Sequence, residues 1–175
     1  MTTTSTASIR PEMPMEEILR NFPSARRALF QRYHVGGCSS CAFQPTDTLA
    51  QVCKDHNILD VDEVVRHLLR SHEVDQRMQV DGRTVQGWLA AGEALRFIDV
   101  RSPQERMDAP VPEAEGLDYQ NSGKYMELAR DTKIVFLCKS GTQSLDVAAY
   151  FAGHGFTRVY AVRGGLDGWR EQPAT

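Results

Sequence analysis

The chain has 175 residues, of which 25% are charged, and a formal net charge of −3. This balance gives no reason to expect nucleic acid or an anionic membrane as a partner, and no apolar run approaches the length of a membrane span. Residues 1–11 begin with a Thr/Ser-rich stretch without an apolar core, which predicts a disordered tail and not a signal peptide. A cytoplasmic location follows as the default, where the four cysteines are expected to be thiols, ligands or catalysts.

Residues 12–74 have the pattern of a small all-α domain. Pro23 can begin a helix, because its backbone angle suits a first turn and its missing N–H is not needed there. Thr48 and Gln51 have capping-box spacing ahead of another helix. An apolar stripe at helical spacing follows, and we expect it to face the core. The stripe consists of Val61, Val64, Val65, Leu68 and Leu69.

The helical domain contains a Val-Gly-Gly-Cys-Ser-Ser-Cys motif that ends in Cys38 and Cys41. With the helix that follows, residues 12–72 resemble the small disulfide domain associated with hybrid-cluster proteins. That resemblance implies a redox-active pair, and this spacing can form a reversible disulfide. A zinc site is the second interpretation, because Cys53 and His56 would complete a set of four ligands. The third is that the thiols are inert, with Cys53 in the core.

Residues 75–82 are polar and predict a linker, after which residues 83–175 alternate between strand and helix patterns. This alternation is typical of an α/β domain in which helices cover both faces of a parallel sheet. The expected elements are a helix capped by Thr84, a strand at 97–100, a loop at 108–121, a helical turn at 125–128, a strand at 134–137, a helix at 144–153, a strand at 158–162 and a helix near Trp169.

Cys138 lies where the apolar strand 134–137 ends and a tight loop leads into the next helix. Ligands bind at such strand ends in parallel α/β sheets. The loop contains small residues and Gly141, so its backbone N–H groups can converge on one point and bind an anion. Convergent N–H groups would hold the cysteine sulfur as a thiolate, because they stabilise the charged form.

Three motifs then follow the order and the spacing of one known family. The segment Cys-Lys-Ser-Gly-Thr-Gln-Ser at 138–144 resembles the rhodanese active-site loop, Asp99-Val-Arg101 resembles the family's strand end, and the segment 164–169 resembles its Gly-Gly-x-x-x-Trp tail. The resemblance covers roughly residues 78–172. It implies a sulfurtransferase without a cofactor, in which Cys138 takes sulfane sulfur from thiosulfate or a persulfide. The resulting persulfide would pass to a thiol acceptor such as glutathione or a thioredoxin-like protein.

The resemblance also assigns roles around Cys138. Lys139 would attract an anionic donor, and we expect Ser144 to cap the helix that follows. We expect Asp99, Arg101 and Glu105 to form a structural ion-pair network, since such networks commonly hold loops in place. The residues expected to bind the donor are Lys139, Ser140, Gly141, Thr142, Gln143 and Ser144.

Two departures from the family pattern concern the substrate. Gln143 stands where the family commonly has Arg, and the family's Gly-His-Ile-Pro-Gly-Ala segment is replaced by other residues at 108–116. The length of the loop nevertheless matches that of the sulfur-transfer proteins. Gln143 favours an alternative, a non-catalytic binding or redox-sensing module in which Cys138 is merely oxidisable. For the enzyme, we expect a relay of sulfur to the pair Cys38 and Cys41, present at high effective concentration in the same chain.

Overall fold

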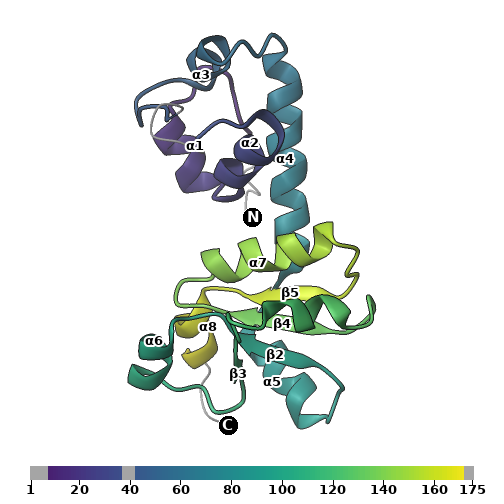
Figure 1. Ribbon diagram of the computed structural model, residues 1–175. Helices are drawn as coiled ribbons and strands as arrows, with labels where there is room; N and C mark the ends of the chain where they lie inside the picture. Colours follow the sequence, from purple (N-terminus) through teal and green to yellow (C-terminus); the bar gives the residue numbers. More distant parts are fainter. Residues whose placement is uncertain (1–7, 37–41, 172–175) are drawn as a thin grey trace, which may run out of the picture. The chain divides into compact units, whose positions relative to one another are not determined.

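The computed structural model describes residues 8–36 and 42–171, and the chain divides into two compact units at residues 76 and 77 (Figure 1). Residues 1–7 of the expected tail and the cysteine pair at 38 and 41 lie outside the described residues. Residues 8–11 were also expected in the tail, but Ile9 is buried in the apolar core and the Pro11 carbonyl oxygen accepts a hydrogen bond from the backbone N–H of Ala50. The described part contains no helix that is both long and apolar enough to cross a membrane.

The first unit is built from helices, as the sequence predicts. Their buried side chains form one apolar core that contains Ile18, Leu29 and Leu68. Thr48 caps its helix as expected, since its hydroxyl accepts a hydrogen bond of 3.2 Å from the backbone N–H of Gln51. Among the described residues, the helices of this unit are α1 (Met15–Asn21), α2 (Ser24–Tyr33), α3 (Leu49–Asp55) and α4 (Val61–Met78). The predicted stripe on α4 faces this core, with Val64 and Leu68 fully buried.

The second unit contains a five-stranded sheet in which every pairing is parallel, in the order β1-β5-β4-β2-β3 (Figure 1). The strands are β1 (Gln79–Val80), β2 (Arg96–Asp99), β3 (Glu115–Gly116), β4 (Ile134–Leu137) and β5 (Val159–Val162). The helices are α5 (Gly82–Ala90), α6 (Pro103–Asp108), α7 (Thr142–Gly153), α8 (Gly165–Arg170) and the 3₁₀ helix η1 (Ser122–Glu127). The predicted α/β class is therefore confirmed.

Strand β4 lies in the middle of the sheet and is buried on both faces, which explains its continuous apolar sequence. Phe136 packs against Phe151 of α7, with 5.0 Å between the ring centroids. Leu137 points to the opposite face, into a second cluster that contains Trp169 of α8. Because side chains alternate along a strand, Cys138 continues on the face of Phe136 and belongs to the cluster under α7.

Several expected elements differ in the structure. Residues 75–82, predicted as a linker, lie in the end of α4, in β1 and at the start of α5, because Met78 is buried and β1 pairs with β5. Asp81, and not Thr84, is the N-cap of α5. The stretch 108–121, predicted to be mostly loop, is mostly loop, and it also includes the last residue of α6 and the edge strand β3, which at two residues is too short to show a periodic pattern.

Candidate active site

Cys138 directly follows β4 and has only 1% of its surface exposed. Two polar groups of the loop lie against its sulfur. The backbone N–H of Gly141 donates to Sγ over 3.0 Å, and Oγ of Ser144 lies 3.2 Å from Sγ. Both groups come from residues that follow Cys138 within six positions, so the loop folds back around its own cysteine.

Gly141 makes this return possible. Its φ angle is +93°, a conformation that side chains other than glycine rarely adopt. A Cβ atom there would also lie 3.1 Å from the backbone nitrogen of Gly164 and 3.2 Å from that of Gly165. The start of α8 therefore packs directly against the loop, so closely that a side chain at Gly141 would be crowded by its backbone.

Helix α8 holds the loop in place through its first turn. The backbone N–H of Leu166 lies 2.9 Å from the carbonyl oxygen of Cys138 and 3.1 Å from that of Lys139, and donates to both. A Cβ atom on Gly165 would lie 2.6 Å from the Cys138 carbonyl oxygen and 2.6 Å from the Gly141 nitrogen. No role at the site was expected for Gly165 and Leu166 from the sequence. The available signal was the Gly-Gly pair, because adjacent glycines often mark a close backbone approach.

Ser144 does not cap α7, contrary to the expectation from the sequence. The N-cap is Gly141, and Ser144 lies in the first turn of the helix with none of its surface exposed. Its hydroxyl lies 3.2 Å from the Gly141 carbonyl oxygen and equally far from Sγ of Cys138. When Cys138 is a thiol, its S–H donates to Ser144; when it is a thiolate, rotation of the hydroxyl lets Ser144 donate to the sulfur.

The other predicted donor-binding residues lie on the surface of the same loop. Their side chains are exposed, whereas the sulfur below them is not. The exposed residues are Lys139, Ser140, Thr142 and Gln143. A donor that reaches Cys138 therefore meets a surface with one ammonium group, two hydroxyl groups and one carboxamide. The assigned binding roles stay predictions.

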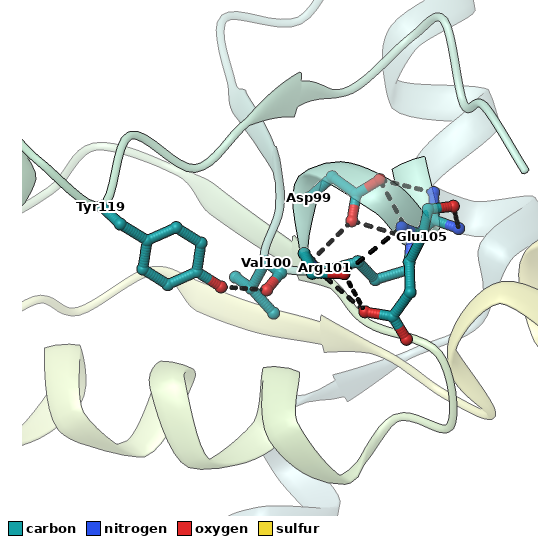
Figure 2. A network of polar contacts seen from close by, with 6 residues as sticks. Asp99, Val100, Arg101, Glu105 and Tyr119 are labelled. Atoms are coloured by element: carbon teal, nitrogen blue, oxygen red, sulfur yellow. Dashed lines mark hydrogen bonds and ion pairs between the residues drawn. The ribbon is translucent and has the colours of Figure 1, made fainter. Parts of the chain in front are cut away.

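Asp99 and Arg101 form a buried ion pair beside this loop (Figure 2). Strand β2 pairs with β4 so that Asp99 is the register partner of Leu137, which places the pair next to Cys138. Nε and Nη2 of Arg101 donate to the two carboxylate oxygens over 2.9 and 2.6 Å, and the side chains are 2% and 3% exposed. The hydrogen bonds that Arg101 donates to Asp99 raise the pKa of Arg101, and the negative charge of Asp99 acts in the same direction.

Glu105 closes a capping box at the start of α6. Its Oε2 accepts hydrogen bonds from the backbone N–H and the hydroxyl of Ser102, over 3.0 and 2.9 Å. These bonds lower the pKa of Glu105, and the positive charges of Lys139 and Arg101 add to the effect. Figure 2 shows Glu105 in one network with Asp99 and Arg101, because Nη1 of Arg101 also donates to the Glu105 carbonyl oxygen over 3.3 Å.

The remaining candidate residues belong to the first unit. Cys38 and Cys41 lie outside the described residues, so their pairing and any metal ligation stay predictions. Cys53 is fully buried in the core, and burial raises the pKa of its thiol. Nδ1 of His56 lies 2.9 Å from the carbonyl oxygen of Val52. Within residues 8–36 and 42–171, no group of three or more His, Cys, Asp or Glu side chains is arranged to hold a metal ion.

The sequence of the second unit matches known proteins. The model of the rhodanese-like domain matches residues 82–172. The chain is 36% identical to thiosulfate sulfurtransferase GlpE of Pseudomonas syringae pv. syringae (strain B728a) over 75 residues, which are 42% of this chain and 71% of the relative. It is 30% identical to a sulfurtransferase of Allochromatium vinosum over 92 residues, which are 52% of this chain and 86% of the relative.

Among solved structures, the human single-domain sulfurtransferase TSTD1 covers 55% of this chain and 98% of its own, with 20% identity and a TM-score of 0.47. The range matched by the family model does not include residues 12–74. The resemblance of that part to the disulfide domain associated with hybrid-cluster proteins therefore stays a prediction.

Proposed function

The chain belongs to the rhodanese-like domain family through residues 82–172, and on that premise we propose that it is a sulfurtransferase whose Cys138 carries sulfane sulfur as a persulfide. Its similarity to thiosulfate sulfurtransferases supports this assignment. The observation that carries it is the position of the Cys138 sulfur, which accepts the Gly141 N–H over 3.0 Å and lies 3.2 Å from the Ser144 hydroxyl. Two such groups favour a thiolate, the nucleophilic form of cysteine.

The reaction has two halves. In the first, the Cys138 thiolate attacks the outer sulfur of the donor, a new S–S bond forms, and the old bond breaks so that the remainder of the donor leaves with the electron pair. With thiosulfate, the leaving group is sulfite. In the second, a thiol acceptor such as glutathione or a thioredoxin-like protein takes the outer sulfur and returns Cys138 to the thiolate. No separate general base is needed when the cysteine is already ionised.

The pair Cys38 and Cys41 would serve as an acceptor within the same chain. The thiolate of Cys38 would attack the outer sulfur of the Cys138 persulfide, which frees the Cys138 thiolate. The thiolate of Cys41 would then attack the sulfur of Cys38 and expel hydrosulfide, leaving a disulfide. The two thiols are oxidised and the sulfane sulfur is reduced to sulfide, so the electrons balance. The basis is the presence of a sulfur-loading cysteine and a Cys-x-x-Cys pair in one short chain.

The relay is tested in a single turnover on protein that has been loaded with persulfide and freed of small thiols. The wild type should release sulfide and form a disulfide between Cys38 and Cys41. The double variant Cys38→Ser/Cys41→Ser should keep its persulfide. Equal sulfide release from both proteins would exclude the relay and leave the sulfurtransferase assignment intact.

Mass spectrometry of the intact protein tests the function itself. The protein is incubated with thiosulfate, polysulfide or glutathione persulfide, with and without reductant. We expect one added sulfur atom that cyanide or a thiol removes, no gain in Cys138→Ser, and a normal gain in Cys53→Ala, which lacks the buried thiol of the first unit. A wild type that stays unmodified with all three donors would instead support the non-catalytic binding or redox-sensing module.

A further inference from the structure

We infer that the physiological donor is a hydropersulfide, R–S–SH, which presents an uncharged sulfane sulfur to Cys138, and not the thiosulfate dianion. This inference rests on the proposed function and names the substrate class of the same site. The basis is that the charged side chains around Cys138 already form ion pairs and hydrogen bonds within the protein.

The two donors place different charges in the transition state. A thiolate that attacks thiosulfate brings one negative charge to a dianion, and the products are a persulfide anion and sulfite. A thiolate that attacks the outer sulfur of R–S–SH brings one negative charge to a neutral group, and the products are a neutral hydropersulfide and R–S⁻. Three negative charges therefore converge in the first case and one in the second. The negative charges of the thiolate and the donor repel each other strongly when they are brought into contact and partly desolvated. A reaction with thiosulfate therefore requires positively charged side chains near the sulfur that are not already paired with carboxylates.

Arg101 is close to Cys138 but its charge is neutralised. The backbone N–H of Val100 donates to the carbonyl oxygen of Leu137 over 2.8 Å, so the segment that begins at Val100 runs beside the Cys138 loop. Asp99 accepts from both Nε and Nη2 of Arg101, with the whole pair buried. Because the Asp99 carboxylate binds Nε and Nη2, only Nη1 of the guanidinium remains for another partner. Nη1 already donates to the carbonyl oxygen of Glu105.

Two more arginines lie at the carboxyl-terminal edge of the sheet, and the contacts of their guanidinium groups are with residues outside the Cys138 loop. Arg163, which follows β5, donates from Nε to Asp81 over 3.0 Å. Arg106 of α6 places its guanidinium against Gly116 in β3, so closely that a Cβ atom on this glycine would overlap it. Neither charge is directed to the loop at Cys138.

The loop contributes one cation, and a fixed carboxylate opposes it. Lys139 is the loop's only charged residue, since Gln143 takes the place of the arginine common in the family. The Glu105 carboxylate accepts two hydrogen bonds from Ser102. Ser102 follows the carboxyl-terminal end of β2, the strand that pairs with β4. The carboxylate cannot swing away without breaking the capping box. The charges of Asp99, Arg101, Glu105 and Lys139 sum to zero, which suits a donor with an uncharged sulfane group and disfavours a dianion.

A single-turnover comparison of the two donors tests this inference. Loading of Cys138 is followed by intact mass spectrometry with thiosulfate and with glutathione persulfide, in the full-length chain at low ionic strength. We expect the second-order rate constant for the persulfide to exceed that for thiosulfate on the order of tenfold or more. In Glu105→Gln this ratio should fall by about three- to fivefold, the effect of one partly exposed charge. Glutamine can also complete a capping box, so α6 keeps its start.

Asp131→Asn is the matched control. Asp131 is an exposed carboxylate three residues before β4, at the opposite end of that strand from Cys138, and its removal should leave the donor ratio unchanged. If thiosulfate loads Cys138 as fast as the persulfide, or if Glu105→Gln and Asp131→Asn shift the ratio equally, the inference is wrong and the sulfurtransferase assignment stands. If neither donor loads Cys138, the proposed function itself fails.

Discussion

The backbone N–H of Leu166 donates to the carbonyl oxygen of Cys138 over 2.9 Å, which ties the first turn of α8 to the loop that surrounds the sulfur. The two residues are far apart in the chain, and Gly165, the first residue of α8, has no side chain that would keep the two backbones apart. The position of the sulfur therefore depends on a helix that contributes no side chain to it.

Replacing Gly165 with Ala should damage the site and the fold together. The new Cβ would lie 2.6 Å from backbone atoms of Cys138 and Gly141, and the φ angle of +60° is unfavourable for alanine. We expect about 3 to 5 kcal/mol of lost stability from strain and overpacking combined, and strongly reduced persulfide loading. Gly92→Ala is the control, because its φ is +69° and a Cβ there meets nothing within 4 Å. It should cost only about 1–2 kcal/mol and keep loading normal.

Replacing Ser144 with Ala should make Cys138 less reactive without unfolding the protein. The thiolate would lose the hydroxyl donor, while the Gly141 carbonyl oxygen would keep its bond from the Leu145 N–H at 3.3 Å. We expect alkylation of Cys138 at neutral pH to slow about tenfold, since a hydrogen bond to a charged group contributes roughly 1.5–3 kcal/mol. Ser24→Ala removes a buried hydroxyl that has no hydrogen-bond partner among the described residues, and its alkylation rate should match the wild type. Equal rates in all three proteins would contradict the role of Ser144.

Replacing Asp99 with Asn should strongly destabilise the second unit. Arg101 would keep its charge in a site that is 2% exposed, without the carboxylate that neutralises it. Breaking a buried pair in this way typically costs about 3–5 kcal/mol, measurable by urea unfolding. The comparison is Glu115→Gln, which breaks the more exposed pair with Arg96 and should cost at most about 1 kcal/mol. Similar losses in both variants would show that the burial of the Asp99 pair has little effect.

Gln143→Arg should improve the use of thiosulfate. The side chain is exposed on the loop, and an added positive charge would attract the dianion. We expect a lower KM for thiosulfate in steady-state assays, with a gain that shrinks as salt rises, because exposed charges are screened over about 8–10 Å at ordinary ionic strength. An unchanged KM would mean that position 143 does not contact the donor.

The stability of the first unit should fall in alkali through Tyr33. Burial, followed by the hydrogen bond to Glu63, raises the pKa of Tyr33 from 10.0 to about 12. A raised pKa contributes stability that is fully present below pH 10 and is lost as the pH rises through about 12. Urea unfolding followed by circular dichroism at pH 9 to 11.5 should therefore show a steeper decline in the wild type than in Tyr33→Phe. Parallel declines would exclude this contribution.

Local patterns in the sequence predicted much of the site. The apolar run 134–137 can only be a buried strand or a short buried helix segment, and the glycine and helical stripe that follow place Cys138 at a strand end. The Thr48 cap and the α4 stripe were predictable for the same reason, since each depends on residues within one or two helical turns. The family resemblance came from three such local motifs in order.

Tertiary structure decided the features that join segments distant in the chain. The strands β1 and β3 have two residues each. They form because β1 pairs with β5 and β3 pairs with β2. The sequence predicted Ser144 as the N-cap of α7, but the helix begins earlier, at Thr142. Ser144 therefore lies in the first turn, with its hydroxyl group against the sulfur of Cys138. The contact of Gly165 and Leu166 with the Cys138 loop depends on how α8 packs against β4 and β5. Local sequence determines which residues can form an element, whereas packing determines which backbones meet, and the environment of Cys138 depends on both.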